Sequence, residues 1–371
     1  MRNARLNIIV VLLFVSGCPT PGDPLTSDAT AVFEFPNGEI VMLGNTAFAP
    51  TAILKQTSFV SFSTDSDRFT GRSPFRGNTS FYSGAMEMDG DLIISGGVIS
   101  TSGLGSRDRY LAKIDRSGHV IWERRYKELA NALIYHAVEI EDGSIRLVGG
   151  LGGVSLFLGE IDPRGDLSFT DLNYAVKAST IVGDFDVIVG ATDYDSRDVR
   201  LTKVSWSHLE LWTATYPFAG EETVAEVMES RNSDILVVGG ATGEAVNPIE
   251  DKFLVLRTTA AGSLVWMTTF DRPQQGFRDG VAIVESQDSS IYIGGPDSLL
   301  KLDTDGNLVW RIVVNGTISD LTMARDGTIL AVGQQFVSPD PRNFITRMLL
   351  LKVDPEGSVL LERTYDGVPY N

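Results

Sequence analysis

The stretch DGSIRLVGG, residues 142–150, decides the fold, because the chain carries versions of it along its whole length. An Asp-Gly pair starts a tight turn, and the residues after it are those of a largely buried strand. The first glycines of successive copies are 39 to 55 residues apart, which indicates a repeated structural unit. The copies occur at residues 40–45 (IVMLGN), 92–97 (LIISGG), 145–150 (IRLVGG), 187–192 (VIVGAT), 235–240 (ILVVGG), 291–296 (IYIGGP) and 329–334 (ILAVGQ).

A second hairpin follows each copy after the first, and LLKLDTDGNLVWRIVV, residues 299–314, is a clear example. An Asp before the turn accepts hydrogen bonds from the turn backbone, and a Gly within it adopts a positive φ. In the fourth copy His208 replaces this glycine, and we predict a turn residue because His enters the left-handed region more readily than most residues. An aromatic residue stands four positions after the turn in five copies: Trp122, Phe169, Trp212, Trp266 and Trp310.

These aromatic residues recur in register with the repeat. We therefore interpret them as core between neighbouring repeats, with a sugar-stacking platform as the alternative. Each repeat supplies four antiparallel strands, which is typical of a β-propeller. The sequence thus predicts an all-β fold, a seven-bladed β-propeller of four-stranded antiparallel blades, preceded by a lipoprotein signal peptide. Since each repeat supplies a whole blade, the ring can close without a strand borrowed from the other terminus.

The consensus patterns L-x-K-x-D-x-x-G-x-x-x-W and DG-x-I-x-x-x-G-G resemble propeller repeats grouped as pyrroloquinoline-quinone-like, and related repeats of bacterial exported propellers. The resemblance covers about residues 30–371 and implies the fold, whereas most proteins with such repeats bind no quinone. Quinone-dependent dehydrogenases typically carry a vicinal disulfide against the cofactor, and this chain has a single Cys. We therefore expect no cofactor.

The first 18 residues, MRNARLNIIVVLLFVSGC, have two arginines followed by an apolar run that is too short to span a bilayer. Their ending resembles the bacterial lipobox, which implies signal cleavage between Gly17 and Cys18 and lipid attachment to the Cys18 thiol. An ordinary signal peptide with a chance Cys, or a buried N-terminal strand, is the alternative. By resemblance to Gram-negative sorting, Pro19 in place of Asp after the lipidated Cys favours the outer membrane.

The predicted organisation has three parts: a signal peptide at residues 1–17, a lipidated Cys with a flexible tether at 18–28, and the propeller at 29–371. The net charge of -17 argues against nucleic acid, because phosphate neutralisation needs clustered Lys and Arg. The expected partners are the membrane, through the lipid anchor, and either another envelope protein or a small ligand.

Acidic residues fall at or near the end of the predicted innermost strand in four repeats: Glu87, Glu139, Glu229 and Glu285. Such ends surround the mouth of a propeller's central channel, so these carboxylates could bind a cation or a basic peptide there. A solvated rim is the alternative. His136 lies on one of these strands and could face the channel, with a satisfied interior histidine as the alternative.

The segment 303–307, DTDGN, looks like the start of a calcium loop, but Val314 stands where the distal Glu belongs. Alignment with the other repeats makes it a hairpin turn. The three histidines lack a zinc-binding spacing and no G-x-S-x-G occurs, so we predict no metal site and no catalytic residue. The predicted function is a membrane-anchored envelope lipoprotein with a non-enzymatic binding propeller. A hydrolase, lyase or ligand/quinone-sensing propeller acting at the channel mouth is the alternative.

Overall fold

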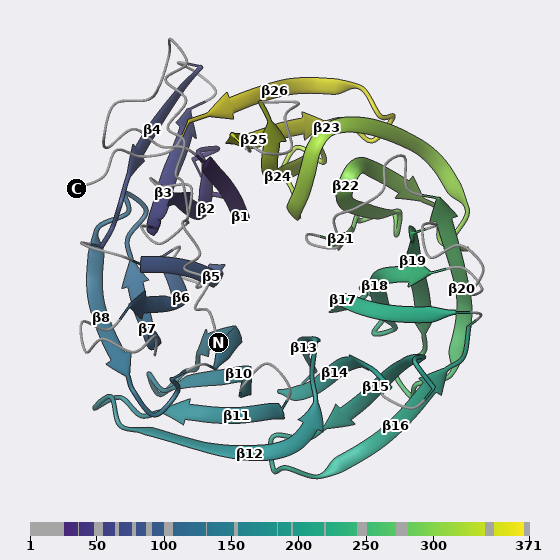
Figure 1. Ribbon diagram of the computed structural model, residues 1–371, viewed down its shortest axis with the longest axis horizontal. Helices are drawn as coiled ribbons and strands as arrows, with labels where there is room; N and C mark the ends of the chain where they lie inside the picture. Colours follow the sequence, from purple (N-terminus) through teal and green to yellow (C-terminus); the bar gives the residue numbers. More distant parts are fainter. Residues whose placement is uncertain are drawn as a thin grey trace, which may run out of the picture.

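The strands are arranged around a central axis, with the innermost strand of each blade nearest to that axis (Figure 1). The all-β prediction and the propeller architecture are confirmed. None of the described residues belongs to a helix with the length and hydrophobicity needed to cross a membrane. The computed structural model describes residues 26–35, 37–47, 55–63, 67–75, 79–86, 91–99, 107–130, 132–151, 155–183, 185–193, 196–218, 220–242, 251–271, 281–337 and 345–366.

The first five blades each consist of four consecutive antiparallel strands. Blade 1 contains β1 (Thr26–Glu34), β2 (Ile40–Ala47), β3 (Lys55–Ser63) and β4 (Arg68–Arg72). Blade 2 contains β5 (Thr79–Met86), β6 (Leu92–Ile99), β7 (Arg107–Ile114) and β8 (Val120–Tyr126). Blade 3 contains β9 (Leu133–Glu139), β10 (Ile145–Leu151), β11 (Ser155–Ile161) and β12 (Leu167–Ala175).

Blades 4 and 5 also consist of four consecutive strands, ordered from the central axis outward, whereas blade 6 is longer. Blade 4 contains β13 (Ala178–Val182), β14 (Asp186–Thr192), β15 (Val199–Val204) and β16 (Glu210–Tyr216). Blade 5 contains β17 (Glu221–Glu229), β18 (Ile235–Thr242), β19 (Asp251–Thr258) and β20 (Leu264–Asp271). Blade 6 contains β21 (Ala282–Glu285), β22 (Ile291–Leu302), β23 (Leu308–Met323), β24 (Ile329–Phe336), β25 (Thr346–Val353) and β26 (Val359–Tyr365).

The prediction of seven four-stranded blades is wrong. Counted by continuous antiparallel ladders, the described strands form six blades, and the last blade has six strands. The cause is two long strands, β22 with 12 residues and β23 with 16. The first half of β22 pairs with β21 and its second half with β23, while the first half of β23 pairs with β22 and its second half with β24. The two expected repeats are therefore joined by hydrogen bonds.

The joining follows from the short spacing of these two repeats. Gly294 and Gly333 are 39 residues apart, the smallest interval between copies. Pro296 pairs with Thr317, so β22 continues past Gly294 into a ladder with β23. The two halves of blade 6 still pack against each other through buried side chains, among them Tyr292.

The ring closes between blade 1 and blade 6 without exchange of a strand. Thr26 of β1 forms a single parallel bridge with Thr346 of β25. The Ser27 hydroxyl accepts the backbone N–H of Met348 at 3.1 Å, and the Thr346 hydroxyl donates to the Ser27 carbonyl at 3.1 Å. On the outside, Arg363 of β26 forms two hydrogen bonds of 2.8 Å with the Asp67 carboxylate.

The repeated glycines of β2, β10, β18 and β24 have a steric cause. Opposite them the innermost strand carries a β-bulge, which pushes its backbone toward the neighbouring strand. A Cβ at Gly239 would lie 1.7 Å from the Thr223 carbonyl oxygen, and a Cβ at Gly333 would lie 1.8 Å from that of Thr317. The glycine of the repeat therefore marks the place where the innermost strand changes direction.

Because the strands of a blade are antiparallel, the described turns that follow the first and third strands of a repeat lie at the same end of the blade, on a face of the ring that we call the turn face. In the outer hairpins the Asp303 carboxylate accepts the backbone N–H groups of Asp305 and Asn307, which confirms a hairpin turn at this segment. His208 has a φ of 69°, so the predicted left-handed turn residue is also confirmed.

Candidate functional site

The aromatic residues of the outer strands connect neighbouring hairpins. The indole N–H of Trp212 donates to the Ala260 carbonyl at 3.2 Å, and that of Trp266 donates to the Thr304 carbonyl at 3.1 Å. Both acceptors lie in the next outer hairpin turn along the ring. The Trp266 ring also lies against Gly306, where a Cβ would be 2.9 Å from the ring. The interpretation as core between repeats is thus confirmed for Trp212 and Trp266, whereas Phe169 is exposed and its ring lies against Phe157 of its own blade.

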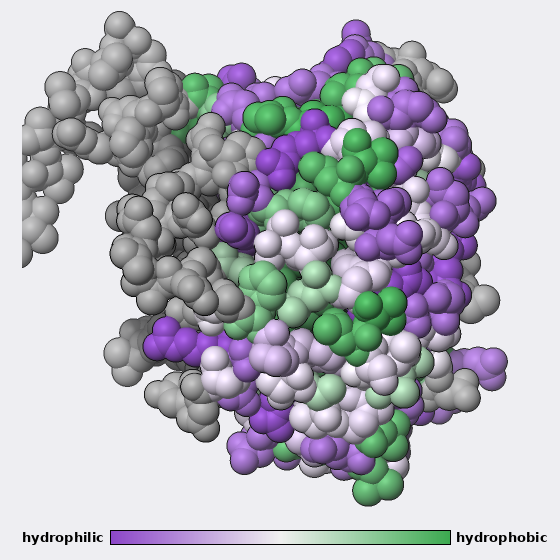
Figure 2. Space-filling model, turned by 90° about the vertical axis from the view of Figure 1, so that its right-hand side faces the viewer, coloured by the Kyte–Doolittle hydropathy of each residue, from purple (hydrophilic) through white to green (hydrophobic). Residues whose placement is uncertain are grey.

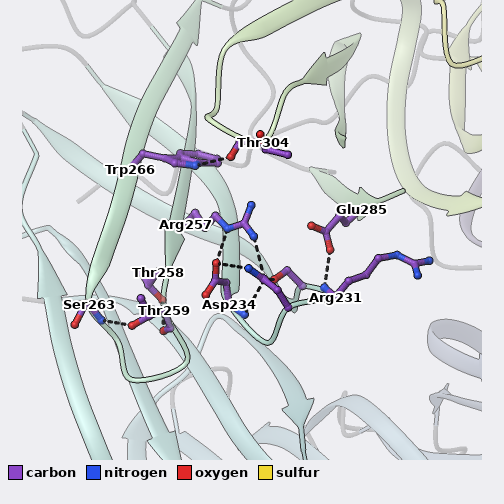
Figure 3. A network of polar contacts seen from close by, with 11 residues as sticks. Arg231, Asp234, Arg257, Thr258, Thr259, Ser263, Trp266, Glu285 and Thr304 are labelled. Atoms are coloured by element: carbon purple, nitrogen blue, oxygen red, sulfur yellow. Dashed lines mark hydrogen bonds and ion pairs between the residues drawn. The ribbon is translucent and has the colours of Figure 1, made fainter. Parts of the chain in front are cut away.

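Charged side chains form a second set of connections near the turn face (Figure 3). Arg257 of β19 donates to the Asp234 carboxylate at 2.7 Å and to the Asn232 side-chain oxygen at 2.9 Å, which fixes the inner turn of blade 5. The Glu285 carboxylate, from blade 6, accepts the Arg231 backbone N–H of that same turn at 2.6 Å. Glu285 therefore joins two blades.

The other predicted glutamates take equivalent positions. Glu229 ends β17 and accepts the Gly183 backbone N–H of blade 4 at 3.3 Å. Glu139 ends β9 and forms an ion pair of 2.9 Å with Lys113 of blade 2. Each of these three glutamates thus contacts the preceding blade. Their role as a binding ring stays a prediction, and Glu87, Gly17 and Cys18 lie outside the described residues.

Sequence reasoning missed one member of this set. Glu34 ends β1, and its carboxylate accepts the Arg325 backbone N–H of blade 6 at 2.7 Å. The signal was present, because Glu34 stands before the Asn37-Gly38 turn as Glu139 stands before its own Asp-Gly turn. The glutamates at the turn face therefore also connect the first and last blades.

A second group of ionisable side chains lies on strands next to the central axis, farther from the turn face than the glutamates. We call these residues, His136, Glu226 and Asp320, the axial layer, because they occupy the same register position in three innermost strands, opposite Val148, Val238 and Val332. Each follows a β-bulge, and each bonds to the next innermost strand around the ring. His136 Nε2 donates to the Ser179 carbonyl at 2.6 Å, Glu226 accepts the Ile283 N–H at 2.8 Å, and Asp320 accepts the Val32 N–H at 2.8 Å.

Burial dominates the protonation of the axial layer. It raises the pKa of Glu226 from 4.5 to about 8, and the Asp320 carboxylate adds to this rise. Burial also raises the pKa of Asp320 from 3.8 to about 7, although the N–H groups of Val32 and Leu321 act in the opposite direction. Burial lowers the pKa of His136 below 6.5. Near neutral pH the layer therefore holds protons that ordinary carboxyl groups would have released.

Of the predicted site residues, His136 is the one that the structure places in the axial layer. Glu226 and Asp320 were missed, although Glu226 stands three residues before Glu229 as His136 stands three before Glu139. Within the described part of the chain, no group of three or more His, Cys, Asp and Glu side chains has a geometry that could hold a metal ion. The chemistry that this layer can perform is uptake and release of protons between buried carboxyl groups.

Comparisons with known proteins support the fold alone. No protein-family model and no curated protein matches this chain. A solved structure of a Lactobacillus plantarum protein is similar with a TM-score of 0.59 and 14% identity, over 88% of this chain and 96% of the other. A quinoprotein alcohol dehydrogenase-like protein from Bacteroides thetaiotaomicron has a TM-score of 0.54 at 11% identity, over 93% and 90% of the two chains.

A third similar structure is an ulvan lyase, a polysaccharide lyase, with a TM-score of 0.52 and 11% identity over 92% of this chain and 96% of that one. At such low identity the similarity establishes a shared propeller architecture and leaves the function to be argued from this chain's own residues.

Proposed function

We propose that this chain is an envelope lipoprotein, anchored through Cys18, whose propeller is a non-enzymatic scaffold for binding another envelope protein. The observation that supports a scaffold is that the most distinctive side chains of the repeat are engaged in contacts within the ring. Trp266, Arg257 and Glu285 all contribute to bonds that hold turns in place or join neighbouring hairpins. Such a ring supports rigid surfaces for recognition, since the side chains that connect it are already engaged.

The anchor rests on the sequence of the leader. Cys18 is the single Cys of the chain and directly follows the small residues of a lipobox-like ending. Two or three acyl chains on this residue give stable membrane attachment, since each buried CH₂ contributes about 0.8 kcal/mol. A net charge of -17 disfavours binding to anionic lipid through the protein surface, so the attachment depends on the lipid.

The anchor is tested by fractionation of cells that express the full-length chain. We expect Cys18→Ala to move the protein from the membrane to the soluble fraction, with Ser16→Ala as a control that keeps the anchor. Pro19→Asp should keep the lipid and shift the protein from the outer to the inner membrane on a density gradient. Membrane retention of Cys18→Ala would contradict the anchor.

The scaffold is tested by crosslinking inside cells. A photoreactive amino acid is placed at the exposed Arg116 on the turn face or at the exposed Arg125 on the outer wall. A scaffold with a defined docking surface gives a crosslink to one protein at one of these positions and not at the other. Equal labelling of many proteins at both positions would contradict a specific partner.

A second function is favoured by the axial layer. Glu226 and Asp320 are half-buried carboxyl groups whose pKa values are raised to about 8 and about 7, near neutrality, which is the property of general acids and bases. An enzyme working at the channel would lose its turnover in Glu226→Gln and Asp320→Asn. A scaffold would keep its crosslinked partner in both variants.

A further inference from the structure

An open groove of about 390 Å³ lies between blade 5 and blade 6. Its lining comes from the end of the outer hairpin of blade 5 and from the outer half of β23, and it consists of Lys252, Thr269, Phe270, Asp271, Leu308 and Arg311. The volume falls in the range of small-molecule sites. The groove is lined by outer strands, whereas the axial layer belongs to strands next to the central axis.

Arg311 is the feature of this groove that needs an explanation. Its Nε atom is buried and has no hydrogen-bond partner, and the guanidinium makes no ion pair within the described part of the chain. A buried donor without an acceptor is costly, and native proteins satisfy such groups in most cases. In a chain with a net charge of -17, acidic residues are plentiful, so an unpaired guanidinium here is unexpected.

Among the described lining residues of the groove, the positive charges exceed the negative ones by one. Lys252 Nζ lies 3.6 Å from Asp271 Oδ1, and the Asp271 side chain is 83% exposed. An ion pair so open to water is weak, and it holds Lys252 loosely. Two cations and one carboxylate thus line the site, and the planar fork of Arg311 matches a carboxylate in two-point contact.

Part of the groove is apolar. Phe270 and Leu308 form part of its lining. Exposed apolar side chains also stand on β20 and β23, the two outer strands that line the groove: Leu264, Val265, Leu308, Val309 and Val313. Figure 2 shows the side of the molecule on which β20 lies, where hydrophobic residues are interspersed with hydrophilic ones. A compact inorganic anion gains nothing from these surfaces, whereas a molecule with an apolar body and one carboxylate contacts both them and the cations.

We propose that this groove binds an organic carboxylate, with Arg311 as the principal contact of the carboxylate, Lys252 as the second cation, and Phe270 and Leu308 against the apolar body. The proposal does not depend on the scaffold function or on the lipid anchor. It assigns a ligand class to a surface between two blades, and it gives the half-buried Arg311 guanidinium a carboxylate partner.

Phenylacetate is a suitable probe, because it joins a carboxylate to a small apolar ring, and phenylacetamide is its uncharged counterpart. Calorimetric titration of the full-length protein at low ionic strength should show binding of phenylacetate and much weaker binding of phenylacetamide and inorganic phosphate. Arg311→Gln should weaken phenylacetate binding by roughly 10-fold or more, since it removes a charge-assisted hydrogen bond. Asp271→Asn should strengthen it, because the competing carboxylate is gone.

Two further variants control for misfolding of Arg311→Gln and for the loss of an arginine elsewhere on the outer strands. Arg311→Lys retains the charge but not the fork, so it should bind more weakly than the wild type and more tightly than Arg311→Gln, and it serves if the Gln variant fails to fold. Arg125→Gln removes an arginine from another outer strand, where it pairs with Glu123, and should leave binding unchanged. Equal affinity of Arg311→Gln and the wild type, or equal binding of phenylacetamide or phosphate, would overturn the proposal.

Discussion

Glu226→Gln should make the stability of this protein depend less on pH. The glutamine has nearly the same shape, and its amide oxygen can still accept the Ile283 N–H that the carboxylate accepts. The two side chains differ in that glutamate can gain or lose a proton and glutamine cannot. Burial raises the pKa of Glu226 from 4.5 to about 8, so the folded protein holds a proton that the unfolded chain releases near pH 4.5.

The pKa shift of Glu226 determines the sign and size of its effect on the free energy of unfolding, because proton binding and folding are linked. Because the folded-state pKa is raised, the contribution of Glu226 to stability is fully present below about pH 4.5 and is lost as the pH rises through about 8. The rise from 4.5 to about 8, at about 1.36 kcal/mol for each pH unit, corresponds to roughly 5 kcal/mol. We therefore expect similar free energies of unfolding at pH 5, and a Gln variant more stable than the wild type by roughly 3 to 5 kcal/mol at pH 9.

The assay is urea unfolding followed by tryptophan fluorescence at pH 5 and pH 9. Glu141→Gln, at an exposed position of a turn, removes the same charge and controls for net charge. Asp320→Asn should act in the same direction, and the double variant should show less than the sum because the two carboxyl groups interact. A difference between wild type and Glu226→Gln that is the same at both pH values would refute the reasoning.

Three further changes test the contacts between blades by chemical denaturation. Trp266→Phe keeps a ring against Gly306 but loses the bond to Thr304, so it should cost about 1 kcal/mol of unfolding free energy; no loss would show that the indole N–H is unimportant. Gly306→Ala should destabilise more than Gly327→Ala, because both have a φ of 82° but only the first Cβ would meet Trp266; equal losses would contradict that contact. Glu285→Ala should cost roughly 1 to 3 kcal/mol by leaving a turn N–H without its acceptor, and Glu285→Gln less; equal stability of all three would contradict the bond.

The repeat was readable from the sequence because it is held by local rules. A Gly at a positive φ, an Asp that accepts turn N–H groups and a Trp in fixed register each act within one hairpin or on its neighbour. His208 shows how far such rules extend, since its left-handed conformation could be predicted from its place in the alignment. The all-β propeller follows from these patterns.

The blade number and the axial layer were not predicted correctly, because both depend on contacts between segments that are far apart in the sequence. Whether β22 stops after Gly294 depends on whether a ladder with β23 can continue through Pro296, and periodicity alone does not contain that information. The axial layer depends on β-bulges, which turn Glu226 toward the next blade. Alignment of the innermost strands would have grouped it with His136, but its pKa comes from burial that only the assembled ring provides.

No strand is exchanged where the ring closes. The chain could therefore begin and end at another boundary between blades and still form the same ladders. Every strand of blade 1 comes from one continuous segment. Ser27 contacts blade 6 through hydrogen bonds that involve side-chain hydroxyls, and Thr26 contacts it through a single bridge. A circular permutant that opens the chain between β16 and β17, and links the original ends, would break none of the described antiparallel ladders. Each blade could then form from its own sequence before the ring is complete, whichever blade is made first.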